Sequence, residues 1–199
     1  MWEAPLNVAL EGPSVRLEPL AHAHAEGLRA SGSDPIIWRW MPTGTAPAEG
    51  SGMDDWVAAA LLEAEAGERV PFAVIDRASG EVIGSTSYLE LRPKHRGLEI
   101  GWTWYARERW GTGVNAACKL LLLEHAFERA GAIRVEFKTD RRNERSRAAL
   151  AKIGAQFEGV LRNHRILTDG GYRDSAYYSV IDEEWLALRA GLEEQLRRH

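Results

Sequence analysis

The hydrophobic period of the sequence changes from that of strands to that of a helix between residues 105 and 114, and this change limits the folds open to the chain. Three extended segments joined by short turns precede it: 70–76, 81–91 and 98–105. After it, apolar residues spaced three or four apart predict a helix over 114–130. Strands joined by short turns are antiparallel, and strands joined through a helix are parallel. A chain that has both kinds of connection is expected to form a mixed sheet.

The other predicted elements complete this order. They are strand 15–20, helices 21–30 and 54–66, strand 132–139, helix 143–153, a hairpin of strands 156–167 and 172–181, and a C-terminal helix over 183–198. Asp169-Gly170-Gly171 supplies the turn chemistry of that hairpin. Within strand 98–105, simple alternation puts Leu98, Ile100, Trp102 and Trp104 on one face and Glu99 on the other. We therefore predict an α+β fold of the three-layer α/β kind, a mostly antiparallel mixed sheet flanked by helices. Residues 1–199 are expected to form one domain.

Composition excludes several classes of protein. The longest apolar run, 120–123, is far too short to span a bilayer, and a net charge of -4 does not favour non-specific nucleic-acid binding. The first residues lack the features of a signal peptide, and the one cysteine, Cys118, fits a reducing compartment, so we expect a cytoplasmic protein. His22 and His24 lack a third ligand nearby, so no metal is expected.

The stretch 107–115 carries the strongest functional signal. It places Gly111 and Gly113 between a strand and the start of a helix, where free N–H groups and the helix dipole bind phosphate. Arg107 and Arg109 could add positive charge. The same residues could also form an ordinary loop with a helix cap.

A dinucleotide would fit such a loop. Gly111-x-Gly113-x-x-Ala116 matches the dinucleotide fingerprint, with Glu136 about 20 residues further on. That fingerprint opens directly from a strand of a parallel sheet, whereas antiparallel strands come first here. The other interpretation of the loop follows from a family resemblance.

Several motifs, taken in order, resemble the GNAT superfamily of N-acetyltransferases and its RimJ/RimL-like branch, the relatives of ribosomal-protein N-terminal acetyltransferases. The motifs are Arg16-Leu17-Glu18-Pro19-Leu20, Leu98-Glu99-Ile100-Gly101-Trp102, Asn143-Glu144-Arg145-Ser146, and Phe157-Glu158-Gly159 with Tyr172-Arg173-Asp174. The resemblance covers about residues 14–185. It implies the GNAT-type acyl-CoA N-acyltransferase fold and the transfer of an acetyl group from acetyl-CoA to an amine.

The resemblance also implies a binding site for acetyl-CoA. Backbone N–H groups of the glycine loop wrap the pyrophosphate: Trp110, Gly111, Thr112, Gly113, Val114 and Asn115. Two of the loop's key positions, Trp110 and Asn115, depart from the family pattern. The pantetheine arm pairs with a splayed central strand at Trp104, Tyr105 and Ala106, and Asn143 holds it from the next helix.

Amine acetylation needs a base for the incoming amine and a stabiliser for the departing thiolate. Glu99 is the expected base, with a structural ion pair to Arg96 or to a helix residue as its alternative. His164 is a second candidate base, or else a surface histidine. Ser146 is expected to contact the sulfur. Leu150 stands where many members of the family have a tyrosine acid.

Other polar side chains have simpler explanations. Cys118 lies in an apolar helix and is expected in the core rather than as a nucleophile. Arg141, Arg142 and Arg145 could contact the CoA phosphates or form a solvated charged face. Asn143 could cap the helix that it begins.

The acceptor side is the least specific part of the sequence. Trp38 and Trp40, between the first two helices, could form an apolar wall for a primary amine, or could pack in the core. The amine could belong to a protein N-terminus or to a small molecule. A homodimer is possible. The alternative function is a non-catalytic module that binds or senses acyl-CoA.

Overall fold

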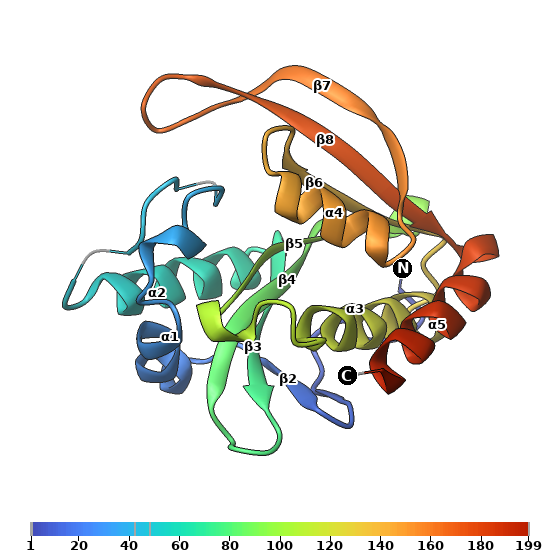
Figure 1. The fold of residues 1–199 in the computed structure, drawn as a ribbon, viewed down its shortest axis with the longest axis horizontal. Coiled ribbons are helices and arrows are strands. Elements are labelled where there is room, and N and C mark those ends of the chain that lie inside the picture. Colours follow the sequence, from blue (N-terminus) through green and yellow to red (C-terminus); the bar gives the residue numbers. More distant parts are fainter. Residues whose placement is uncertain (1, 42, 48, 199) are drawn as a thin grey trace.

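A computed structural model describes residues 2–41, 43–47 and 49–198 of the chain (Figure 1). The strands are β1 (Leu10–Glu11), β2 (Val15–Pro19), β3 (Arg69–Asp76), β4 (Val82–Arg92), β5 (Gly97–Tyr105), β6 (Arg134–Asp140), β7 (Gln156–Ile166) and β8 (Tyr172–Ile181). The α-helices are α1 (Ala25–Ser31), α2 (Gly52–Glu65), α3 (Val114–Glu124), α4 (Glu144–Lys152) and α5 (Asp182–Arg197). Short helical turns are η1 (His22–His24), η2 (Pro35–Ile37), η3 (Pro93–His95), η4 (Arg107–Arg109) and the π-helical η5 (His125–Arg129).

The eight strands form one mixed sheet in the order β1-β2-β3-β4-β5-β6-β8-β7. Only β5 and β6, which α3 connects, run parallel; every other neighbouring pair is antiparallel. The α+β class and the mixed sheet predicted from the change of period are confirmed. Two details differ from the prediction: the short strand β1 was not predicted, and the helix predicted over 114–130 ends as η5.

Two hydrophobic cores lie on opposite faces of the sheet. The larger core gathers apolar residues of α3, α4 and α5 against the strands, with Leu122 and Val135 fully buried. The smaller core lies under α1 and α2 and contains Leu28, Val57 and Ala73. Figure 1 shows α1 and α2 at one end of the sheet, α3 and α5 together beneath its other half, and the β7–β8 hairpin arching over α4. The N-terminal turns of α3 lie beneath the end of β5, because Tyr105 Oη donates to Asn115 Oδ1 at 3.4 Å and Lys119 Nζ donates to Thr103 Oγ1 at 3.1 Å.

The last helix offers a stability test that does not involve the site. Gly191 lies inside α5, and a Cβ added there meets no heavy atom within 4 Å. Because alanine loses less backbone entropy than glycine on entering a helix, Gly191→Ala is expected to raise the free energy of unfolding by about 0.5–1 kcal/mol. Urea denaturation measures this, and an unchanged or lower midpoint would contradict it.

Candidate active site

The strands β5 and β6 separate after three residue pairs. Gly97, Leu98 and Glu99 pair with Arg134–Glu136, and no pairing between the two strands follows in the described chain. Beyond that point β5 stays with β4, whose Gly84 pairs with Tyr105, and β6 stays with β8. The backbone groups along the inner edges of the two strands therefore face a gap. This divergence is the splayed strand that the resemblance implied.

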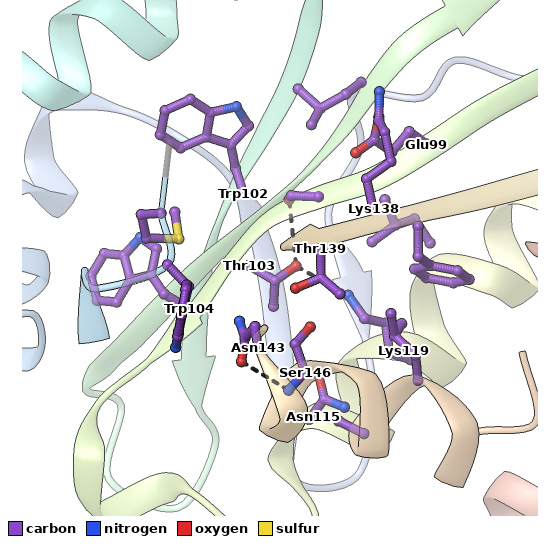
Figure 2. A pocket seen from close by; sticks show the side chains of 18 of the residues that line it. Glu99, Trp102, Thr103, Trp104, Asn115, Lys119, Lys138, Thr139, Asn143 and Ser146 are labelled. Carbon is purple, nitrogen blue, oxygen red and sulfur yellow. Dashed lines mark hydrogen bonds and ion pairs between the residues drawn. The ribbon is translucent and has the colours of Figure 1, made fainter. Parts of the chain in front are cut away.

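A cavity of about 790 Å³ fills this gap and passes from one face of the sheet to the other (Figure 2). Residues 99–105 of β5 line one side and residues 137–139 of β6 line the other. The glycine loop and the first turns of α3 and α4 close its ends. A channel of this size holds a small ligand or one arm of a larger one.

A bulge in β5 decides which side chains enter the cavity. The register with β4 shifts between Ser85 and Ser87, and Trp102 has a φ of 49°. The extra residue reverses the alternation. Trp104 consequently lies in the smaller core, whereas Leu98 lies in the larger one. The prediction that Trp102 and Trp104 share a face with Leu98 and Ile100 was wrong for this reason, because both indoles lie on the Glu99 face.

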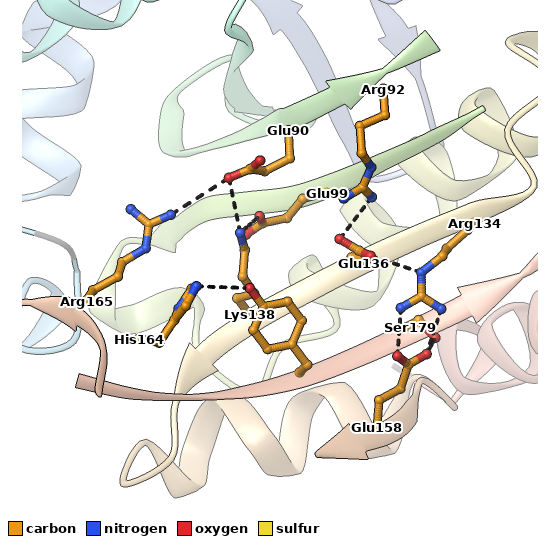
Figure 3. Close-up of polar contacts among 11 residues, drawn as sticks. Glu90, Arg92, Glu99, Arg134, Glu136, Lys138, Glu158, His164, Arg165 and Ser179 are labelled. Carbon is orange, nitrogen blue, oxygen red and sulfur yellow. Dashed lines mark hydrogen bonds and ion pairs between the residues drawn. The ribbon is translucent and has the colours of Figure 1, made fainter. Parts of the chain in front are cut away.

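Glu99 is buried on the α1–α2 face of the sheet, at the point where the strands part. Its Oε2 lies 2.6 Å from Nζ of Lys138 on β6, and Lys138 also reaches Glu90 at 3.3 Å (Figure 3). Burial raises the pKa of Glu99 above its ordinary value, against the opposing effect of the Lys138 ammonium. The expected ion-pair partners were wrong: the partner comes from a neighbouring strand, while Arg96 donates a hydrogen bond to the Gly131 carbonyl.

Lys119 occupies the opposite face of the sheet, below the same gap. It is buried, its Nζ donates to Thr103 Oγ1 at 3.1 Å, and it lies 5.6 Å from the ring centre of Phe137. Burial lowers the pKa of Lys119 to about 8. The sequence interpretation missed this residue. Its signal was a single lysine in the otherwise apolar run 116–123.

The glycine loop leads into α3 as predicted. Gly111 and Gly113 have φ values of 80° and 88°, in the left-handed region that favours glycine. Trp110, Gly111 and Asn115 line the cavity, whereas Thr112, Gly113 and Val114 do not. Trp110 Nε1 donates to the Tyr105 carbonyl at 3.1 Å, which ties the loop to the end of β5.

Two arginines supply the positive charge at this end of the cavity. The guanidinium carbons of Arg145 and Arg107 lie 3.2 Å and 4.3 Å from the ring centre of Trp110. Within the described part of the chain neither of them pairs with a carboxylate. Arg109, expected to add charge, instead binds Asp76 at 2.7 Å. Of the predicted patch on α4, Arg141 and Arg142 pair with Asp174 and Asp140, which leaves Arg145 as its cavity-facing member.

The start of α4 forms the cavity wall opposite the loop. Asn143 is buried, and its Oδ1 accepts from the Ser146 N–H at 3.1 Å, so it is the N-cap. Asn143, Ser146 and Leu150 all line the cavity, together with Trp104 and Tyr105. Ala106 is buried beside them but outside the lining. Cys118 is fully buried in the larger core, as predicted, and burial raises its pKa to about 12.

The two tryptophans predicted for the acceptor side separate in the structure. Trp40 lines the cavity, with the guanidinium carbon of Arg142 5.4 Å from its ring centre. Trp38 does not: it is fully buried, and its Nε1 donates to the Gly32 carbonyl at 2.8 Å. The prediction of an acceptor contact was therefore wrong for Trp38. Trp102, from the bulge, provides a second half-buried indole of the wall.

His164, the second candidate base, lies outside the cavity lining. His164 lies on β7, bonded to Ser175 Oγ at 3.0 Å and Tyr177 Oη at 3.3 Å, and burial lowers its pKa. Residues 2–41, 43–47 and 49–198 contain no group of three or more potential metal ligands. Across the same residues, no helix combines the length and apolarity that crossing a membrane requires.

Comparison with known proteins assigns this geometry to a family. A family model described as "Acetyltransferase (GNAT) domain" matches residues 14–156. The Bacillus subtilis protein named "Putative ribosomal N-acetyltransferase YdaF" is 35% identical over 106 residues, which are 53% of this chain and 57% of that protein. The chain thus spans little more than half the length of this curated relative.

Solved structures match nearly the whole chain. A "putative acetyltransferase" from T. thermophilus is 42% identical, with a TM-score of 0.86, covering 98% of this chain and 100% of that one. A GCN5-related N-acetyltransferase from Brucella melitensis is 30% identical, with a TM-score of 0.90, covering 98% and 89%.

Proposed function

Because this chain belongs to the GNAT family of acetyltransferases, we propose that it transfers the acetyl group of acetyl-CoA to a primary amine. The amine attacks the thioester directly while both substrates are bound. The observation that carries the proposal is the gap between β5 and β6, which leads from a basic, glycine-lined end to a buried carboxylate. The N-acetyltransferase is proposed to be a single cytoplasmic domain.

The donor site is proposed along the glycine loop and β5. N–H groups of residues 110–115 and the N-terminus of α3 suit a pyrophosphate, and Arg107 and Arg145 complement its charge. The pantetheine arm is proposed to lie along the inner edge of β5 at 104–106, beyond the last residues that pair with β6. Asn143 closes this channel from α4.

Glu99 and Ser146 are proposed to carry the chemistry. Glu99 accepts a proton from the attacking amine, directly or through one water, and its raised pKa suits a base better than an ordinary carboxylate. The N–C bond forms, the C–S bond breaks, and the electron pair goes to sulfur. Ser146 faces the cavity one turn into α4, where its hydroxyl can donate to that sulfur. Trp40 and Trp102 are proposed to border the acceptor, a protein N-terminus or a small amine.

A melting experiment tests the donor site. Acetyl-CoA at about 100 times its dissociation constant is expected to raise the free energy of unfolding by roughly 2.7 kcal/mol. CoA should act similarly, and NAD should leave the melting temperature unchanged. An absent shift with millimolar acetyl-CoA would contradict the proposal.

A second measurement separates an enzyme from a binding module. Amines of different classes are added with acetyl-CoA, and free thiol is followed with time. Thiol release that depends on the amine supports the transferase. Binding of acetyl-CoA without release for any amine would instead indicate the non-catalytic acyl-CoA module.

A further inference from the structure

We infer that the Lys119 ammonium protonates the sulfur of coenzyme A as the thioester breaks. This assignment rests on the proposed function and adds a catalytic residue to it. It starts from a buried lysine at the floor of the cavity that no step above uses. Figure 2 shows its side chain reaching from α3 toward Thr103, while Ser146 borders the cavity from α4.

Some N–H donors of the Lys119 ammonium have no acceptor among the described residues and can face the cavity. An ammonium group has three N–H donors. Among the described residues only Thr103 Oγ1 accepts one of them, and the ring of Phe137 covers another side. A buried ammonium without a carboxylate is destabilised unless a polar or negative group reaches it. The departing thiolate is such a group, and it forms in the channel that Lys119 borders.

The position of Lys119 also fits the direction of the reaction. Glu99 lies on the upper, α1–α2 face of the sheet and Lys119 on the lower, α3 face, with the gap between them. An amine that enters past Glu99 reaches the thioester from the α1–α2 side, and Lys119 borders the part of the same channel on the α3 side, where it can meet the sulfur. Leu150, from α4, has no proton to give, and Ser146 can donate a hydrogen bond but ionises too weakly to transfer its proton.

The proton balance closes without another reactant. The amine loses one proton to Glu99, and the thiolate gains one from Lys119, giving the amide and free thiol. Glu99 then releases its proton, and neutral Lys119 regains one from solvent, which restores both groups. Neither oxidation nor reduction takes place.

The acidity of Lys119 suits this transfer. Its pKa of about 8 lies close to that of an ordinary thiol, about 8.5, whereas an exposed lysine near 10.4 would leave the sulfur ionised. The cavity wall carries other titratable or charged groups from several elements: Glu63 of α2, Glu68, Arg69 of β3, Glu90 and Arg92 of β4, Glu99 and Tyr105 of β5, Arg109 of η4, Lys138 of β6, Arg145 of α4, Arg165 of β7 and Arg173 of β8. Of the four carboxylates, Glu90 and Glu99 bind Lys138 and Glu63 binds Arg69, and among the described residues none of the four pairs with Lys119.

The test compares Lys119→Met with the natural chain in two ways. The first is the pKa of the thiol of bound CoA, followed by the ultraviolet absorbance of the thiolate. The nearby ammonium is expected to lower this thiol pKa by about one unit or more, and the methionine variant should lose that lowering. Methionine has a similar length and removes a buried charge, so the variant is expected to fold and to melt at or above the natural temperature.

The second readout is the pH dependence of turnover. Because the donor must be protonated, kcat/KM of the natural chain is expected to fall as pH rises through about 8, and this fall should be absent in Lys119→Met. At neutral pH the variant should lose about tenfold in kcat, since a thiolate leaves fairly well without a proton. Lys152→Met, which removes an exposed lysine of α4 outside the cavity, is the matched control and should retain both behaviours.

Two results would overturn the assignment. One is a Lys119→Met variant that binds CoA with an unchanged thiol pKa and an unchanged pH profile; the transferase would then stand without this residue. The other is stable acetylation of Lys119 by acetyl-CoA, because a lysine consumed in that way cannot act in each turnover. If the natural chain does not bind CoA at all, the proposed function itself is contradicted. This outcome differs from the first, in which CoA binds and only the role of Lys119 fails.

Discussion

The Glu99→Gln variant is expected to turn over about 100-fold more slowly than the natural chain, or slower still, because general bases contribute typically 10²–10⁴-fold. Glutamine has nearly the same shape but cannot accept the proton of the amine. Binding of acetyl-CoA should persist, since its proposed contacts lie along 104–115. The effect is measured as kcat with saturating acetyl-CoA, and the melting temperature is recorded beside it because Lys138 loses its partner.

The matched control is Glu136→Gln. Glu136 is the register partner of Glu99 on β6, bears two arginine contacts and lies outside the cavity lining. Its replacement should leave kcat near that of the natural chain. As the base must be ionised, kcat/KM should also rise with pH through the pKa of Glu99, which lies above the ordinary value of about 4.3. Equal losses in both variants would contradict a catalytic role for Glu99.

The second large effect is expected at Gly84, where β4 passes very close to β5. A Cβ added at Gly84 would lie 2.2 Å from the carbonyl oxygen of Trp104 and 2.9 Å from Cα of Tyr105. These are backbone atoms, so the end of β5 itself must move. Gly84→Ala is therefore expected to lower the free energy of unfolding by about 3 kcal/mol, the upper part of the range for overpacking. It should also abolish the melting shift with acetyl-CoA, because the proposed pantetheine contacts are displaced.

Gly191→Ala is the control, because it is the same substitution at a position where the added Cβ meets no other atom. It should keep the full acetyl-CoA shift while raising stability. Both proteins are compared by urea denaturation and by ligand titration below their melting temperatures. A Gly84→Ala variant with natural affinity for CoA would show that the end of β5 does not carry the donor site.

Local patterns were sufficient to predict the fold. Alternation, helix periodicity and the Asp169-Gly170-Gly171 turn located the main strands and α-helices within a few residues, and the order of elements indicated the family. These signals depend on neighbours in the sequence, so they can be recognised without knowledge of the tertiary structure. The glycine loop was located by the same means, since the positive φ angles of Gly111 and Gly113 are local properties of the backbone.

The errors arose where a residue's role depends on distant contacts. The bulge at Trp102 reverses the faces of β5, and alternation alone cannot reveal an extra residue. Arg109 is neutralised by Asp76, which lies more than thirty positions earlier. Trp38 is anchored to Gly32 in the core, although its neighbour Trp40 reaches the cavity. Composition gives no means of separating two tryptophans so close in sequence.

The gap between β5 and β6 also divides the sheet into two mechanical units. Strands β1–β5 and strands β6–β8 are joined through the sheet only by the short pairing of Gly97–Glu99 with Arg134–Glu136. Amide protons beside such a seam exchange through local opening more readily than those of fully paired strands. A ligand that forms hydrogen bonds to the inner edge of β5 and packs against β6 would connect the two parts of the sheet. If the donor binds as proposed, the two halves are expected to open as one unit, with the substrate acting as a structural member of the sheet for as long as it stays bound.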